Sequence, residues 1–190
     1  MSEKEYPKPS LTADCVTFSL DDAGRLAVLL IQRARDPFAG RWAIPGGFCE
    51  PGETVMESAA RELVEETGVA GLHIEELGCY SRPGRDPRGW VVSIAHIAVL
   101  PTSRREEAKG GDDASAAKFF TITEEERGES ISLHHGDEYA DSLAFDHDEI
   151  LAAALRRLEA RAGVLIPLLV GHSLSADEAA LALAKSLGRN

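Results

Sequence analysis

GFCEPGETVMESAARELVEETGV occupies residues 47–69, and its second half has the pattern of an α-helix with two marked ends. Thr54 is followed three residues later by Glu57, which is the spacing of a capping box at a helix N-terminus. Gly68 is suited to end a helix in the left-handed conformation. The sequence therefore predicts a helix from Thr54 to Thr67.

Three carboxylates crowd one face of this predicted helix. Glu62 and Glu66 are four residues apart, and Glu65 lies between them on the same side. Like charges at this spacing repel, and the repulsion raises their pKa values. A solvated helix face is one interpretation. The other is a site for hard divalent cations such as Mg²⁺ or Mn²⁺, which prefer carboxylate oxygens and would offset the repulsion.

The spacing within residues 47–69 favours the metal site. The segment resembles, position for position, the signature of the Nudix hydrolases: Gly, five residues, Glu, seven residues, then Arg-Glu-apolar-x-Glu-Glu-x-Gly-apolar. The matching residues are Gly47, Glu53, Arg61, Glu62, Leu63, Glu65, Glu66, Gly68 and Val69. A chance match over so many positions is rare. The resemblance beyond this segment is looser and covers most of residues 10–160.

The resemblance implies a role for each matching polar residue. Arg61 would orient a glutamate through a paired hydrogen bond, and Glu53 would reach back to the helix as a water-mediated ligand or structural partner. Glu65 would be a further metal ligand or the catalytic base. The implied ligands of Mg²⁺ or Mn²⁺ are Glu62, Glu65, Glu66 and the carbonyl of Gly46. The implied reaction is attack of water on a pyrophosphate in a nucleoside diphosphate linked to another group.

Residues 85–89, Arg-Asp-Pro-Arg-Gly, resemble a segment of an ADP-ribose pyrophosphatase-like Nudix subgroup, which includes effector domains of NAD-related transcriptional regulators. Arg85 and Arg88 could bind a diphosphate or ribose, and Trp90 could stack on a base. The regulators often have His where this chain has Trp90. In the alternative interpretation Asp86 pairs with its neighbours and Trp90 packs in a strand. Arg33 and Arg35 are further candidates for phosphate contact.

The general base is left open by the sequence. In ADP-ribose-cleaving relatives a loop can supply it, so Asp113 or Asp112 in the segment Gly110–Asp113 is a candidate beside Glu65. A plain solvent loop is the alternative there, and Glu106 and Glu107 compete for the role. The pair His134-His135 has no second spaced ligand and is not expected to bind metal.

The remaining chain alternates strands and helices, which predicts an α+β fold, specifically a Nudix-type α/β/α sandwich with a mixed sheet. Residues 103–115 are expected to be a polar loop, and residues 123–145 to be irregular, with a possible helical turn near Glu124–Glu126. We expect a flexible tail (1–10), a hydrolase domain (11–162) and a C-terminal helical extension (163–190). The predicted strands are Ala13–Leu20, Arg25–Gln32, His73–Tyr80, Trp90–Leu100 and Ala117–Ile122, and the later helices Asp146–Ala162 and Ser173–Leu187.

The composition limits the partners. The net charge of -12 argues against nucleic-acid binding, which needs a basic face, but not against a small anionic substrate. Three cysteines without a CxxC pattern, and a polar N-terminus, indicate a cytoplasmic protein with reduced thiols. The longest apolar run, residues 162–170, is too short to span a bilayer. Relatives of this kind are commonly dimers, so a homodimer is expected.

Two functions follow from the resemblance. The first is hydrolysis of ADP-ribose to AMP and ribose 5-phosphate. The second is a regulatory module that senses ADP-ribose, in which a winged-helix DNA-binding domain follows the Nudix domain. Residues 165–169 and the helix after them faintly resemble the start of such a domain. The intact acidic segment and the acidic composition favour hydrolysis.

Overall fold

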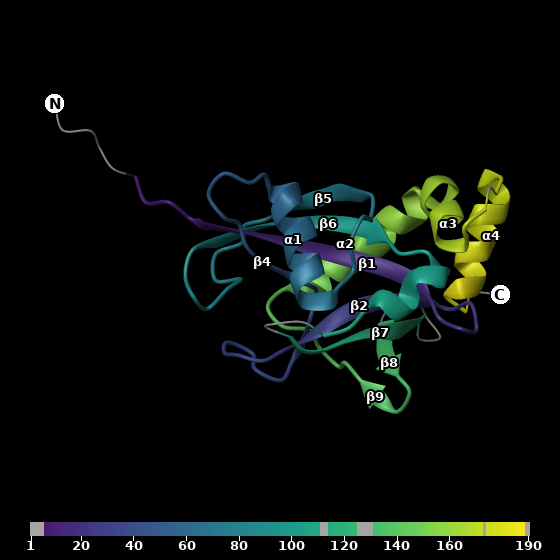
Figure 1. Ribbon diagram of the computed structural model, residues 1–190, viewed down its shortest axis with the longest axis horizontal. Coiled ribbons are helices and arrows are strands. Elements are labelled where there is room, and N and C mark those ends of the chain that lie inside the picture. The colour runs from purple at the N-terminus through teal and green to yellow at the C-terminus, as the bar shows by residue number, and fades with distance from the viewer. Residues whose placement is uncertain (1–5, 111–113, 125–130, 173, 189–190) are drawn as a thin grey trace.

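The computed structural model describes residues 6–110, 114–124, 131–172 and 174–188, and Figure 1 shows a sheet with helices packed around it. The strands of the described residues are β1 (Ser10–Leu20), β2 (Leu26–Arg33), β3 (Trp42–Ala43), β4 (Gly46–Phe48), β5 (Ile74–Tyr80), β6 (Val91–Val99), β7 (Ala114–Glu124), β8 (Ile131–His135) and β9 (Glu138–Tyr139). Their helices are α1 (Val55–Thr67), α2 (His147–Ala160), α3 (Ala162–Val170) and α4 (Ala176–Ser186), with a short 3₁₀ helix, η1 (Thr102–Glu107).

The sheet is mixed, as predicted. Its order is β5-β6-β1-β2-β7-β8-β9, with β3 added to β2 and β4 added to β1. Strands β1 and β6 run parallel, and the other pairs between described strands are antiparallel. The α+β fold with a mixed sheet is therefore confirmed.

Helices cover both faces of the sheet, which explains why the central strands are continuous apolar runs rather than alternating ones. On β2, Val28 and Leu30 belong to the core that contains α2, α3 and α4. Ala27 and Leu29, on the opposite face, pack in the core that contains α1. The sheet is thus the middle layer of a sandwich, with α1 on one side and α2 on the other (Figure 1).

Helix α1 has the ends that the sequence predicts. The Thr54 side chain accepts a hydrogen bond from the Glu57 backbone N–H, and the Glu57 side chain accepts one from the Thr54 backbone N–H. Gly68 ends the helix with φ 74°, a left-handed conformation that glycine adopts without strain. The same reciprocal cap, between Ser175 and Glu178, begins α4.

The expectation that residues 123–145 are irregular was wrong in part. Strands β8 and β9 form a hairpin that turns at Gly136, which has φ 59°. Leu133 is buried, and Ile131 packs against the core, so the segment alternates inward and outward even though its composition is acidic. Glu124 ends β7 and does not begin a helical turn. Residues 125 and 126 lie outside the described residues.

Two other expected boundaries also shift, and one helix, α3, was not among the predicted ones. The predicted tail of residues 1–10 overlaps β1, which begins at Ser10, and residues 1–5 lie outside the described residues. The predicted polar loop 103–115 contains η1 and, at its end, the start of β7. The apolar run 162–170 forms α3, with Pro167 inside the helix, and its Leu165, Ile166 and Leu169 join the core beneath α2. None of the helices in the described ranges is both long and apolar enough to cross a membrane.

Candidate active site

The segment before α1 approaches both β1 and the helix so closely that Gly46 and Gly47 have no room for a side chain. Strand β4 pairs antiparallel with β1, which places Gly46 opposite Asp14. A Cβ atom on Gly46 would collide with the Asp14 side chain, and one on Gly47 would collide with the carboxylate of Glu62. Glycine is therefore required at both positions, because a larger residue would push the loop off the helix.

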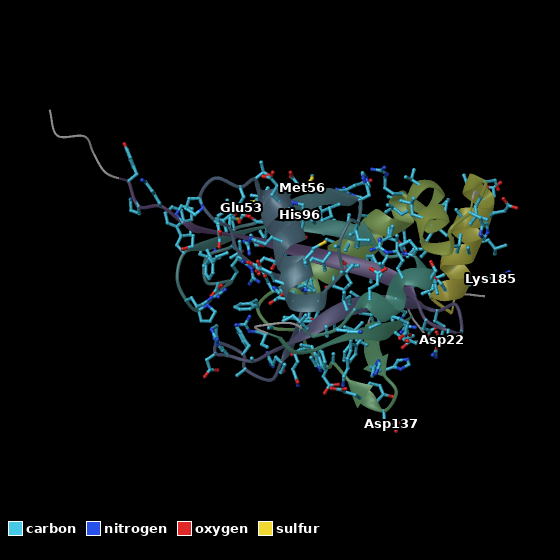
Figure 2. All side chains as sticks on the ribbon, viewed as in Figure 1. Asp22, Glu53, Met56, His96, Asp137 and Lys185 are labelled. Carbon is cyan, nitrogen blue, oxygen red and sulfur yellow. The ribbon has the colours of Figure 1, made fainter. Side chains whose placement is uncertain are left out.

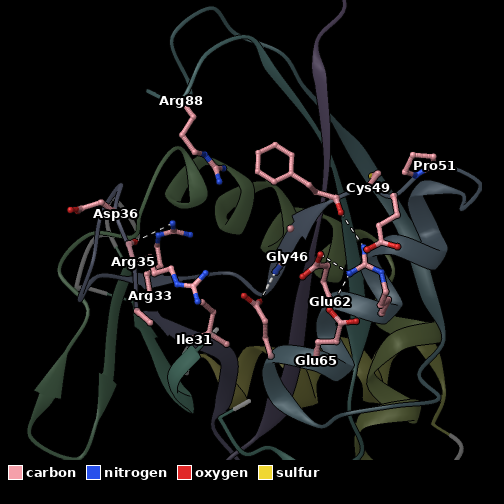
Figure 3. A pocket seen from close by; sticks show the side chains of 16 residues that line it. Ile31, Arg33, Arg35, Asp36, Gly46, Cys49, Pro51, Glu62, Glu65 and Arg88 are labelled. Atoms are coloured by element: carbon pink, nitrogen blue, oxygen red, sulfur yellow. Dashed lines mark hydrogen bonds and ion pairs between the residues drawn. The ribbon is translucent and has the colours of Figure 1, made fainter. Parts of the chain in front are cut away.

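One side of a cavity of about 530 Å³ is lined by Glu62, Glu65 and Glu66 of α1 (Figure 3). We call these three residues the acidic wall. The Gly46 backbone N–H donates a 2.9 Å hydrogen bond to Glu66 Oε2, which ties the loop to the helix. Burial raises the pKa of Glu66 to about 8, outweighing this hydrogen bond, and the neighbouring charges of Glu62 and Asp14 add to the rise. A group in this state gains from a nearby cation.

Arg61 organises the other carboxylates. Its guanidinium lies 2.8 Å from Glu53 Oε1, 2.8 Å from Glu62 Oε1 and 3.1 Å from Glu65 Oε2. It also donates a hydrogen bond to the carbonyl of Phe48. The Arg61 hydrogen bonds lower the pKa of Glu53 to about 2, whereas burial raises the pKa of Glu62 despite the same partner. Arg61 therefore fixes the geometry of the wall.

The donor set fits a hard divalent cation. Glu62, Glu65 and Glu66 line one cavity together with Gly46, and carboxylate and carbonyl oxygens are the ligands that Mg²⁺ and Mn²⁺ prefer. Within the described ranges, however, no three acidic, His or Cys side chains stand close enough together to form a ready-made ligand group. Two of the glutamates instead turn one oxygen each to Arg61. Small side-chain rotations would have to accompany binding of the ion.

The opposite side of the cavity is basic, and we call Arg33, Arg35 and Arg88 the basic wall. Figure 3 shows these side chains across the cavity from Glu62 and Glu65. Arg33 Nε donates a 2.8 Å hydrogen bond to the carbonyl of Pro37. Burial and the nearby Arg88 lower the pKa of Arg33. Three guanidinium groups thus face three carboxylates across the cavity. Such a cavity suits a ligand that binds cations on one side and arginines on the other, as phosphates do.

The two arginines of the Arg-Asp-Pro-Arg-Gly segment have different surroundings. Arg85 forms a buried paired hydrogen bond with Asp146, at 2.8 and 2.6 Å, and both side chains are 3% exposed. Arg88 lines the cavity and is held at 2.6 Å by Asp86. Arg85 is not among the residues that line this cavity and instead lines a smaller one, together with Gly46. The side chain in position for a ligand in the larger cavity is that of Arg88.

Several predicted residues do not line this cavity. Trp90 is 57% exposed and is not among its lining residues. Asp112 and Asp113 lie outside the described residues. Glu107 pairs with Arg104 on η1. His134 and His135 line a separate cavity beside the β8–β9 hairpin, and Figure 2 shows Asp137 at the hairpin's tip, far from Glu53.

Sequence reasoning missed two groups beneath the site. Asp14 is 5% exposed, accepts a hydrogen bond from Ser93 Oγ and faces His147 Nε2 at 3.9 Å. His147 Nδ1 accepts a 2.9 Å hydrogen bond from the Ile44 backbone N–H, two residues before Gly46. A polar residue inside the apolar run of β1 was the available signal for Asp14. For His147 only its place at the start of a predicted helix was visible.

Known proteins resemble this chain in sequence and in fold. Residues 9–138 match the NUDIX domain family. The ADP-ribose pyrophosphatase of Methanocaldococcus jannaschii is 42% identical over 129 residues, covering 68% of this chain and 66% of that protein. The ADPR responsive transcriptional repressor NtrR of Acinetobacter baylyi is 33% identical over 158 residues, covering 82% of this chain and 57% of the repressor. The chain thus spans just under two thirds of the length of the first relative and less of the second.

Among solved structures, a MutT/nudix family protein from Enterococcus faecalis superimposes with a TM-score of 0.87. It is 38% identical, and the match covers 100% of this chain and 78% of that one. The agreement therefore includes α3 and α4 as well as the sandwich.

Proposed function

The chain belongs to the NUDIX family, and from that premise we propose that it is a pyrophosphohydrolase that converts ADP-ribose and water to AMP and ribose 5-phosphate. The observation that carries the proposal is the pairing of an acidic wall with a basic wall across one cavity. The 42% identity to an ADP-ribose pyrophosphatase supports this choice of substrate.

Nudix hydrolases generally need divalent metal ions, and we propose Mg²⁺ or Mn²⁺ here, held by Glu62, Glu65, Glu66 and the Gly46 carbonyl. Such an ion would neutralise phosphate charge and lower the pKa of a bound water. Arg61 holds Glu62 and Glu65 in place, and Glu53 anchors Arg61 from its other edge. Gly46 fixes Glu66 through its N–H. These contacts hold the carboxylates near one another, so that small rotations are enough for them to reach the ion.

On the other side of the cavity, Arg33 and Arg88 would bind the diphosphate oxygens that face away from the helix. Arg85 and Trp90 remain candidates for substrate contact, but Arg85 would first have to leave Asp146. Glu65 is our candidate for the base that takes a proton from water, since it lines the cavity and half of its side chain is exposed. Asp113 is the alternative base.

The test is to incubate the purified protein with ADP-ribose and one metal at a time, and to separate the products by chromatography. We expect AMP and ribose 5-phosphate in equal amounts with Mg²⁺ or Mn²⁺, and none in excess chelator. Glu76→Gln, which changes an exposed carboxylate on β5 outside the cavity, serves as a control of unchanged activity. AMP formation no faster than in a blank without protein would reject the proposal.

A second candidate function is an ADP-ribose-sensing module of a regulator. The similarity to the repressor, over 82% of this chain, favours it. The net charge of -12 speaks against DNA binding by these residues themselves. A gel-shift titration over a range of salt concentrations separates the two: tight binding to one DNA site without turnover of ADP-ribose would select the sensor.

We further propose a cytoplasmic homodimer that does not bind nucleic acid. The free thiols of Cys15, Cys49 and Cys79 support a reducing compartment. Light scattering on the eluting chromatographic peak measures the mass of the assembly. A mass of one chain at every protein concentration would contradict the dimer.

A further inference from the structure

Two phenylalanines near the basic wall have an unusual backbone conformation. Among the residues that the structure describes, Phe38 (φ 65°) and Phe145 (φ 57°) are the ones other than glycine with positive φ. Residues with a Cβ atom are rarely found in this region, because the atom crowds the following carbonyl. Such outliers persist only where surrounding contacts hold them, and they cluster at functional sites.

The two rings hold each other in place. Phe38 lies in the turn after β2 and Phe145 lies just before α2, yet their ring centroids are 4.9 Å apart in an edge-to-face arrangement. Both rings are partly buried against a small core of Ile31, Ala43 and Ala144. Each of the two turns therefore contributes one ring to this edge-to-face contact.

One of these rings, that of Phe145, contacts the basic wall directly, and Phe38 acts through it. The Arg33 guanidinium lies over the Phe145 ring, 4.8 Å from its centroid. The Arg88 guanidinium lies between two rings, 5.2 Å from the centroid of Phe145 and 4.6 Å from that of Phe48. Like charges repel, so stacking on a shared ring offsets part of the cost of keeping both arginines together. Phe145 is the contact that the two arginines share.

We propose that Phe38 and Phe145 are positioning residues, which set Arg33 and Arg88 side by side to bind the part of the diphosphate that faces away from the acidic wall. This inference rests on the proposed function for the identity of the substrate. It assigns to two apolar residues a part in substrate affinity, because Phe145 is the contact that sets the two guanidinium groups relative to each other. Without the ring, Arg33 would keep its hydrogen bond to the Pro37 carbonyl and Arg88 its ion pair with Asp86, but the substrate itself would have to bring the two groups together.

The test compares Phe145→Leu and Phe38→Leu with Phe119→Leu. Phe119 also carries a stacked arginine, with the Arg105 guanidinium 5.1 Å from its ring, but Arg105, unlike Arg33 and Arg88, does not line the cavity between the walls. Phe119 is 6% exposed, so Phe119→Leu is expected to lower the free energy of unfolding at least as much as Phe145→Leu or Phe38→Leu does. With ADP-ribose, we expect Phe145→Leu and Phe38→Leu to raise KM by about tenfold with kcat changed less than about threefold, while Phe119→Leu leaves KM and kcat unchanged. Phe145→Tyr keeps the ring and is expected to restore most of the affinity.

A binding measurement separates this inference from the proposed function. Calorimetric titration of the protein with inorganic pyrophosphate in excess chelator reports on the basic wall without turnover. Weaker pyrophosphate binding by Phe145→Leu, but not by Phe119→Leu, would support the inference even if ADP-ribose proved not to be hydrolysed. Equal affinities in wild type, Phe145→Leu and Phe38→Leu would overturn it, as would an equal loss in Phe119→Leu. Phe38→Leu changes a partly exposed turn residue, so it keeps the test valid if Phe145→Leu does not fold.

Discussion

The two walls of the cavity are built in different ways. The acidic wall comes from one helix and is held by the loop that precedes it. The hydrogen bond from Gly46 to Glu66 joins residues only 20 positions apart in the sequence. The basic wall comes from the end of β2, the residues just after it and the loop before β6. That loop is held to the segment before α2 by the Arg85–Asp146 pair, which joins residues 61 positions apart. When the residues of a site are close together in the sequence, their spacing reveals the site. When the fold brings distant residues together, the site can be recognised only from the structure.

The largest expected effect comes from breaking the acidic wall. Glu66→Gln or Glu65→Gln should lower kcat with ADP-ribose by about a thousandfold, roughly 4 kcal/mol, because a ligand of the ion or a base is lost at the reacting phosphate. Circular dichroism and the urea midpoint should remain close to those of wild type, since the replacement is nearly isosteric. Turnover like that of wild type in both variants would mean that the chemistry lies elsewhere.

In the loop that carries Arg88 of the basic wall, the largest expected effect is instead on the free energy of unfolding. Asp146→Asn leaves the buried Arg85 guanidinium without its ionised partner, and breaking a buried pair from one side costs about 3 kcal/mol. Urea unfolding measures this loss. Asp148→Asn, which changes an exposed carboxylate in the first turn of the same helix, should cost far less. If Arg85 contacts substrate rather than holding the loop, Asp146→Asn will change KM more than stability, and the comparison between the walls will need revision.

The sequence predicted the part of the site whose geometry is set by residues close together in the chain. Thr54, Gly68 and the glutamate spacing specify the helix, and the spacing of Gly47 from Glu62 specifies the loop that packs on it. For the second wall, residue type alone could not distinguish Arg85, which is buried on Asp146, from Arg88, which lines the cavity. That difference depends on where α2 begins.

The fold shows the same division. Strands buried on both faces and capped helices were recognisable, because apolar runs and capping residues are local signals. The β8–β9 hairpin was missed because only Ile131 and Leu133 mark its inward face among polar neighbours. Phe38 and Phe145 could not be anticipated at all, since nothing in their neighbouring residues predicts a positive φ.

His147 lies beneath the site, in the smaller cavity that Gly46 and Arg88 also line, and its effect on stability should depend on pH. Burial lowers its pKa in the folded protein, whereas in the unfolded chain the value is near 6.5. Its contribution is therefore fully present above about pH 6.5 and is lost as pH falls below that value, by up to about 1.4 kcal/mol per pH unit, because only the unfolded chain takes up the proton. Glu66, with its pKa raised from 4.5 to about 8, acts in the opposite direction over that range.

The measurable quantity is therefore the difference between wild type and His147→Gln, which removes the titration and keeps an acceptor for the Ile44 N–H. Urea unfolding at pH 7.5, 6.5 and 5.5 gives the free energy of unfolding of each. We expect the gap between the two proteins to narrow as the pH falls below about 6.5. A gap that is constant across this range would show that His147 is protonated to the same extent in the folded and unfolded states.

The smallest expected effect tests whether the acidic wall depends on the end of its helix or on the contacts along it. Thr54→Ala removes the cap of α1 and should lower the free energy of unfolding by about 1 kcal/mol. Ser175→Ala removes the matching cap of α4, away from the cavity, at a similar cost. Because Gly46 and Arg61 hold the glutamates further along α1, kcat should change less than about twofold in both variants. A tenfold loss of kcat confined to Thr54→Ala would show instead that the position of the whole helix, and not its local contacts, places the carboxylates.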